Sequence, residues 1–230
     1  MTKGTVLFDN KLKTVFNIVS LILLGIVLQI GGAYIVNAAV ESLNGVEAAS
    51  QYKDYMAYIR SIEPKQFANI IFVAPLVEEL VFRLIFLRAG KMVLPFWAAN
   101  LAQAALFAIY HNVTIQRVYV FVMGLIIGAV FYYCPLILRN TYPEKGSMKL
   151  LELPNSLIGF GATFILHMVI NTAGLFLAPL LPADIPIAMQ YFIGIVMMAI
   201  ACAAVYQLYR QQAAAISEPV EDNTGTGGIS

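Results

Sequence analysis

The sequence predicts an all-α protein, a polytopic bundle of about six transmembrane helices with one further amphipathic helix at the membrane surface. Of the 230 residues, 60% are hydrophobic and only 12% are charged, which leaves too little polar surface for a soluble domain of this size. The formal net charge of +1 gives no basis for binding nucleic acid. We therefore expect an integral, multi-pass membrane protein whose surroundings are the lipid bilayer.

Six segments are apolar over the roughly 20 residues that a helix needs to cross the hydrocarbon core. They are about Val15–Val40, Phe67–Leu87, Val93–Tyr110, Val118–Leu138, Leu157–Ala178 and Ile187–Tyr209. The first of these runs is too long for the apolar region of a cleavable signal peptide, so we expect it to remain as a span.

The polar connection Glu41–Lys65 separates the first two spans and carries apolar residues at helical spacing. These residues are Ala48, Tyr52, Tyr55, Met56, Ile59 and Ile62. One apolar face and one polar face are typical of a helix that lies in the membrane interface, with its tyrosines at the level of the headgroups.

The distribution of basic residues predicts that both termini are cytoplasmic. With the N-terminus inside, the cytoplasmic side receives Lys3, Lys11, Lys13, Arg88, Lys91, Arg139, Lys145, Lys149 and Arg210. The outer side receives Lys53, Arg60, Lys65 and Arg117. For a bacterial source we expect the protein to lie in the cell membrane.

Three regions follow from this division of the chain. Residues 1–14 form a cytoplasmic N-terminal segment, residues 15–210 the membrane domain, and residues 211–230 a polar cytoplasmic tail that we expect to be disordered. In the fourth span, Gly124 and Gly128 form a Gly-x-x-x-Gly pair, which predicts close packing against another helix.

Two adjacent carboxylates, Glu78 and Glu79, lie in the middle of the second apolar segment. Ionisable groups at membrane depth are costly and mark functional sites by default. Glu79 and Arg83 are four residues apart, so a helix places them on one face, where they can pair. Glu78 is offset by ~100° and is free to face a cavity. Pro75 lacks an amide hydrogen and is expected to leave the carbonyl of Ile71 unpaired.

The only two histidines of the chain also lie in apolar helical segments. His111 closes the third span one turn after Phe107, and His167 lies midway along the fifth span. Asn171 follows His167 by four residues, so both side chains can aim hydrogen-bond donors at one point, an arrangement that suits an oxyanion.

Together these residue types supply what hydrolysis of an amide needs. A carboxylate and a histidine beside one water can remove its proton, two donors can stabilise an oxyanion, and an arginine can balance the charge. Each group also has a structural interpretation. A Glu–Arg pair can be a buried ion pair, and a buried histidine or asparagine can be an interhelical hydrogen bonder. All of them would then have to be structural at once.

The three motifs Glu78-Glu79-x-x-x-Arg83, Phe107-x-x-x-His111 and His167-x-x-x-Asn171 resemble those of the CPBP family. This family comprises the CAAX-protease and bacteriocin-processing (Abi) intramembrane proteases, which include the Ras-converting CAAX endopeptidases. The similarity extends from about Phe72 to Gly174 and includes the glycine-bearing helix around Gly124.

The resemblance implies a role for each residue of the site. Glu78 would activate the attacking water with the help of His111, and His167 and Asn171 would stabilise the oxyanion. Glu79 and Arg83 would order the site. No cofactor is expected, although zinc bound by Glu78, His111 and His167 is an alternative.

The expected boundaries place His111 far from Glu78 in depth. His111 lies twenty residues beyond Lys91, which corresponds to ~30 Å along an upright helix. The two residues can meet only if the third span is strongly tilted or if residues 91–95 already enter the membrane.

The sequence thus predicts an intramembrane endopeptidase whose partner is a peptide or membrane-protein substrate. The resemblance extends this to maturation of a peptide or bacteriocin, or to self-immunity. One alternative is a catalytically silent scaffold or immunity factor that binds a partner through its helices. Another is a small transporter that uses the ionisable residues as a relay, although the two halves of the chain show no inverted repeat.

Overall fold

The computed structural model describes residues 3–139, 153–182 and 184–217, and these residues form helices and no strands. The prediction of an all-α bundle is confirmed. In chain order the elements are α1 (Lys3–Ser42), α2 (Glu47–Ser61), α3 (Pro64–Ala68), η1 (Asn69–Val73), α4 (Ala74–Glu79), η2 (Leu80–Leu87), α5 (Arg88–Val93), α6 (Phe96–Tyr110), α7 (Thr114–Arg139), α8 (Leu153–Phe176), η4 (Ala178–Leu180) and α9 (Ile187–Ser217).

Four helices in the described part of the chain are long and apolar enough to cross a membrane, where the sequence predicted six. They are Phe16–Ser42, Thr114–Cys134, Asn155–Leu180 and Ile187–Gln207. The third predicted span is the 15-residue helix α6, which begins only at Phe96 because Leu94 is extended and Pro95 precedes the helix. The second is a run of short helical segments, α3 to α5, that passes twice from α-helical into π-helical register and back.

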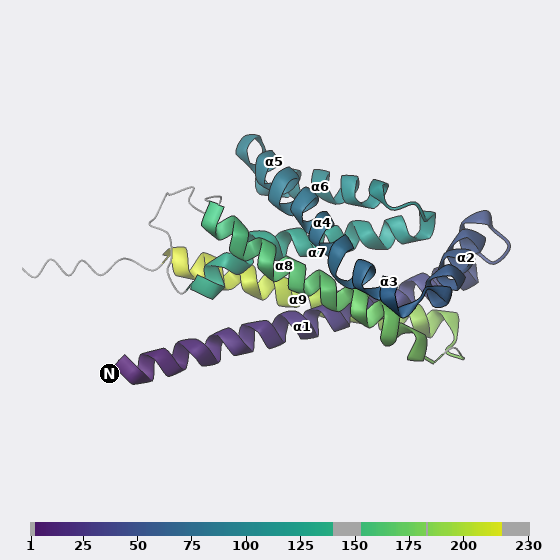
Figure 1. Cartoon of the computed structure of the whole chain (residues 1–230), viewed down its shortest axis with the longest axis horizontal. Helices are drawn as coiled ribbons and strands as arrows, with labels where there is room; N and C mark the ends of the chain where they lie inside the picture. The colour runs from purple at the N-terminus through teal and green to yellow at the C-terminus, as the bar shows by residue number, and fades with distance from the viewer. Residues whose placement is uncertain (1–2, 140–152, 183, 218–230) are drawn as a thin grey trace, which may run out of the picture.

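The long helices α1, α7, α8 and α9 share one hydrophobic core. Figure 1 shows α1 and α9 side by side along one edge of the bundle, with α6 on the opposite side of α7. Leu28, Ile127, Leu166 and Ala201 contribute one fully buried side chain from each long helix. Outward-facing residues such as Phe16 and Phe192 are apolar and exposed, as expected for a surface in contact with lipid.

The glycines of α7 let α6 approach closely, as predicted. A Cβ atom on Gly128 would lie 1.9 Å from Asn100 Oδ1, and one on Gly124 would lie 3.1 Å from Ala104 Cβ. At this contact the Asn100 amide donates to the Leu125 carbonyl (3.0 Å) and the amide of Gln103 donates to the Gly124 carbonyl (2.9 Å). Small residues and interhelical amide hydrogen bonds therefore position α6, which carries His111 at its end.

The helix that leads into Pro75 has the hydrogen-bond register of a π-helix. The carbonyl that Pro75 leaves without a backbone partner is therefore one residue away from the predicted one. In η1 the amide of Ala74 donates to the carbonyl of Asn69, five residues earlier. In the same register the missing amide of Pro75 leaves Ile70 unpaired, not Ile71. Asn171 of α8 donates its side-chain amide to this Ile70 carbonyl at 2.8 Å.

The predicted amphipathic helix is α2, which is fixed to the bundle by one turn of small and apolar residues. Ala49 is 1% exposed and packs with Val36 and Val40 of α1 and with Ile115 of α7. Figure 1 shows α2 at the end of the bundle where α6 passes into α7.

At the other end of the chain, α9 continues to Ser217, so the predicted tail is helical where it begins. The remainder of that tail lies outside the described residues, and so do Lys145 and Lys149, two of the basic residues that predicted the orientation.

Candidate active site

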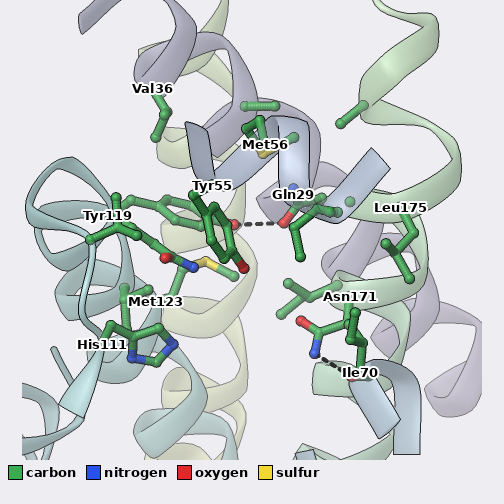
Figure 2. A pocket seen from close by; sticks show the side chains of 18 of the residues that line it. Gln29, Val36, Tyr55, Met56, Ile70, His111, Tyr119, Met123, Asn171 and Leu175 are labelled. Carbon is green, nitrogen blue, oxygen red and sulfur yellow. Dashed lines mark hydrogen bonds between the residues drawn. The ribbon is translucent and has the colours of Figure 1, made fainter. Parts of the chain in front are cut away.

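The predicted site residues meet around one cavity of about 590 Å³ inside the helical bundle. Glu78, His111, His167 and Asn171 line it, and Glu79 and Arg83 lie directly behind its wall. The walls come from α1, α2, η1, α4, α6, α7 and α8, so segments far apart in the sequence converge here. In Figure 2, His111 and Asn171 approach the cavity from different helices.

Glu79 and Arg83 form the predicted ion pair, which is completely buried. Arg83 Nη1 lies 3.2 Å from Glu79 Oε1, and both side chains are 0% exposed. The Arg83 guanidinium also lies 4.3 Å from the centre of the Phe107 ring, a cation–π contact. Phe107 is the residue of the second motif that precedes His111 by one turn. The first and second motifs are thus joined through a buried cation.

His167 bridges the two glutamates. Its Nδ1 donates to Glu79 Oε1 at 2.8 Å, and its Nε2 lies 3.5 Å from Glu78 Oε2. The Glu79 carboxylate therefore sets the orientation of the imidazole and favours a proton on Nδ1. Nε2 and the Glu78 carboxylate are left facing one another at the edge of the cavity.

His111 reaches the same cavity from the end of α6. Its Nδ1 lies 2.9 Å from the Phe107 carbonyl, an acceptor that requires a proton on Nδ1 and leaves Nε2 available. Because α6 begins at Phe96, His111 lies ~22 Å along the helix rather than ~30 Å. Glu78 and His111 line the same cavity in the structure.

Asn171 performs a structural task as well as lining the cavity. One of its two amide hydrogens is used by the Ile70 carbonyl, and the other is available to a ligand. The predicted pair of oxyanion donors, His167 and Asn171, thus lies on one face of α8, at the cavity wall.

Further cavity residues were not singled out from the sequence. Tyr119 of α7 donates to Gln29 Oε1 of α1 at 2.9 Å, and Tyr55 of α2 enters the cavity beside them (Figure 2). Gln29 is a polar residue within the first span, which was a usable signal. Thr163 lies against Glu79, one turn before His167 on α8, and is completely buried.

The three residues predicted as possible zinc ligands, Glu78, His111 and His167, do not form a preformed metal site. Among the residues that the structure describes, no cluster of three or more His, Cys, Asp or Glu side chains is arranged to hold a metal ion. Both ring nitrogens of His167 face carboxylates, and Nδ1 of His111 faces a backbone carbonyl. Metal dependence stays a prediction for experiment.

The fold and the site define a class of protein: a polytopic helical membrane protein with a Glu–Arg–His–Glu array beside a cavity between its helices. Comparison with known families shows what part of this chain resembles. The family model for Rce1-like type II CAAX prenyl endopeptidases matches residues 62–138, in agreement with the family suggested by the motifs. The match includes Glu78, Glu79, Arg83 and His111 and supports a CAAX-type intramembrane endopeptidase. No curated protein and no solved structure matches the chain.

Proposed function

We propose that this protein is an intramembrane endopeptidase that hydrolyses a peptide bond with a water molecule activated by Glu78. The observation that carries the proposal is the contact of Glu78 with His167 at the wall of the cavity, backed by the buried Glu79–Arg83 pair. A carboxylate that faces both a histidine and an open volume is placed to accept a proton from water.

In the proposed reaction, water attacks the carbonyl carbon of the scissile bond while Glu78 accepts its proton. His111 holds the water through Nε2, since its Nδ1 is committed to the Phe107 carbonyl. The carbonyl oxygen becomes an oxyanion, which His167 Nε2 and the remaining amide hydrogen of Asn171 stabilise. Collapse of the intermediate breaks the C–N bond, and Glu78 returns the proton to the leaving amine.

Glu79 and Arg83 act as positioning residues in this scheme. Glu79 accepts the hydrogen bond from His167 Nδ1 and so orients its ring, and Arg83 balances the charge of the buried Glu79 carboxylate. Neither needs to touch the substrate.

The proposed substrate is a peptide or a membrane-associated protein, and the proposed orientation places both termini in the cytoplasm. For a bacterial source, the proposed roles are maturation of a peptide or bacteriocin, or self-immunity. These roles rest on the family resemblance.

The test uses purified protein in detergent and a quenched fluorescent peptide library. Wild type is expected to cleave, whereas Glu78→Gln, His111→Ala and His167→Ala are expected to lose at least ~100-fold in rate, the size of a lost general base or oxyanion donor. Glu47→Gln removes a surface carboxylate of α2 and serves as the matched control. Full activity of Glu78→Gln would overturn the proposed mechanism. A folded wild type that cleaves nothing would favour the silent scaffold.

A further inference from the structure

The amphipathic face of α2 is turned toward the cavity. The residues that line the cavity from this helix recur at spacings of three and four, and they are Tyr52, Tyr55, Met56, Ile59 and Arg60. The same periodicity predicted contact with the membrane interface, because a helical pattern shows that one face is apolar without showing what covers it. Figure 2 shows Tyr55 and Met56 extending into the cavity above His111 and Asn171.

Arg60 is the only lysine or arginine among the described residues that line the cavity. Its guanidinium acts electrostatically on Tyr52 and forms no ion pair with a carboxylate in the described part of the chain. Burial raises the pKa of Tyr52 to about 12 and also raises the pKa of Tyr55, so both phenols stay neutral at physiological pH. The cavity face of α2 is therefore aromatic and apolar with one positive charge.

Other cations near this end of the bundle already have partners. Arg117 donates to the His111 carbonyl, Lys53 donates to Asn44, and Lys65 pairs with Glu63. Arg60 thus differs from its neighbours both in lining the cavity and in having no hydrogen-bond or ion-pair partner among the residues that the structure describes.

The charged side chains of the cavity wall also belong to different helices. Glu78 lies on α4 with His167 of α8 beside it, whereas Arg60 lies on α2. An anionic group on a peptide is repelled by the Glu78 carboxylate and attracted by the Arg60 guanidinium, so the cavity gives a bound peptide one preferred direction. The planar guanidinium binds a carboxylate through two parallel hydrogen bonds, which adds geometric selectivity.

We infer that Arg60 binds a carboxylate of the substrate peptide, while the aromatic face of α2 holds the residues beside it. The carboxylate belongs to the C-terminus of the peptide or to an acidic side chain. This inference rests on the proposed endopeptidase function and adds to it a substrate class, an anionic peptide, and a specificity-determining residue. The helix α2 ends at Ser61, just before the segment that the family model matches.

The test compares matched peptides on the purified protein. A quenched peptide found by the library is made with a free C-terminal acid, as the C-terminal amide, and with each acidic side chain replaced by its amide. For wild type, loss of the recognised carboxylate is expected to raise KM about tenfold, which is about 1.4 kcal/mol. In Arg60→Gln this preference disappears because the acid form now binds as weakly as the amide form. Arg60→Lys keeps part of the preference, and Lys53→Gln, which removes a cation from the same helix, keeps all of it.

A binding measurement separates this inference from the proposed function. The Kd of labelled library peptides, each in its acid and its amide form, is measured by fluorescence anisotropy on Glu78→Gln, with and without Arg60→Gln, so that no cleaved peptide is required. A preference for the acid that requires Arg60 supports the inference even if wild type cleaves nothing, an outcome that would sink the endopeptidase proposal alone. Cleavage that requires Glu78, with equal KM for acid and amide forms, would overturn the role of Arg60 and leave the proposed function standing. Equal Kd values for both forms would do the same.

Discussion

Removal of the buried Arg83 charge should be far more damaging than removal of the whole Glu79–Arg83 pair. Both side chains are 0% exposed and their closest atoms are 3.2 Å apart. Arg83→Met leaves Glu79 as an uncompensated buried carboxylate, which costs about 3–5 kcal/mol. The substitution also removes the cation–π contact with Phe107, worth up to about 2 kcal/mol in a desolvated site.

The double variant Glu79→Gln/Arg83→Met is expected to recover most of this loss. No buried charge of the pair is left uncompensated in it, and the side-chain carbonyl of a glutamine at position 79 would still accept the hydrogen bond from His167 Nδ1. Replacement of a buried ion pair by neutral groups of similar volume is often close to neutral in stability. The coupling free energy of the cycle should therefore be at least ~2 kcal/mol.

Thermal unfolding in detergent measures this effect. For a chain of this length, 1 kcal/mol corresponds to about 2–4 °C in Tm, so Arg83→Met should melt roughly 6–20 °C below wild type. Lys53→Gln, which removes an exposed cation, should stay within ~2 °C. A single variant as stable as wild type, or a double variant that loses the sum of the two single losses, would refute the ion-pair reasoning.

Three further predictions concern packing, the π-helical register and metal. Gly128→Ala places a Cβ atom against Asn100 and should cost about 1–3 kcal/mol of stability. A Cβ atom on the control Gly161→Ala meets nothing within 4 Å, so this variant should not lower Tm. Equal Tm values for the two variants would contradict the close approach of α6 and α7. Asn171→Ala should cost about 1–3 kcal/mol of stability by leaving the Ile70 carbonyl unpaired. The loss should be smaller in a Pro75→Ala background, because the new backbone amide at position 75 can donate to a carbonyl of the preceding turn. An unchanged loss would argue against the assigned hydrogen bond. Peptide cleavage should survive chelator, with less than one zinc per active molecule by elemental analysis; loss of activity that zinc restores would establish the metal-dependent alternative.

Much of the site was predictable because its residues are unusual for their surroundings. Charged and imidazole groups inside apolar segments are rare, so Glu78, Glu79, Arg83, His111 and His167 stood out without knowledge of the fold. The Glu79–Arg83 pair followed from helical periodicity alone. Tyr119 and Thr163 were not predicted, since a tyrosine or threonine in an apolar helix is ordinary.

The number and bounds of the spans were less well predicted. Hydropathy averages over a window, so it does not register that Leu94 and Pro95 delay the start of α6 until Phe96. The window therefore overestimated the length of helix between Lys91 and His111.

The sequence by itself determined the helical membrane class of the protein, the side chains of the site and the amphipathic character of α2. Tertiary structure decided the hydrogen-bond register around Pro75, the bridging of both glutamates by His167 and the direction in which α2 faces. The physical reason is that periodicity and composition act within one helix. The partner of a carbonyl, a carboxylate or an apolar face belongs to another helix, and only packing selects it.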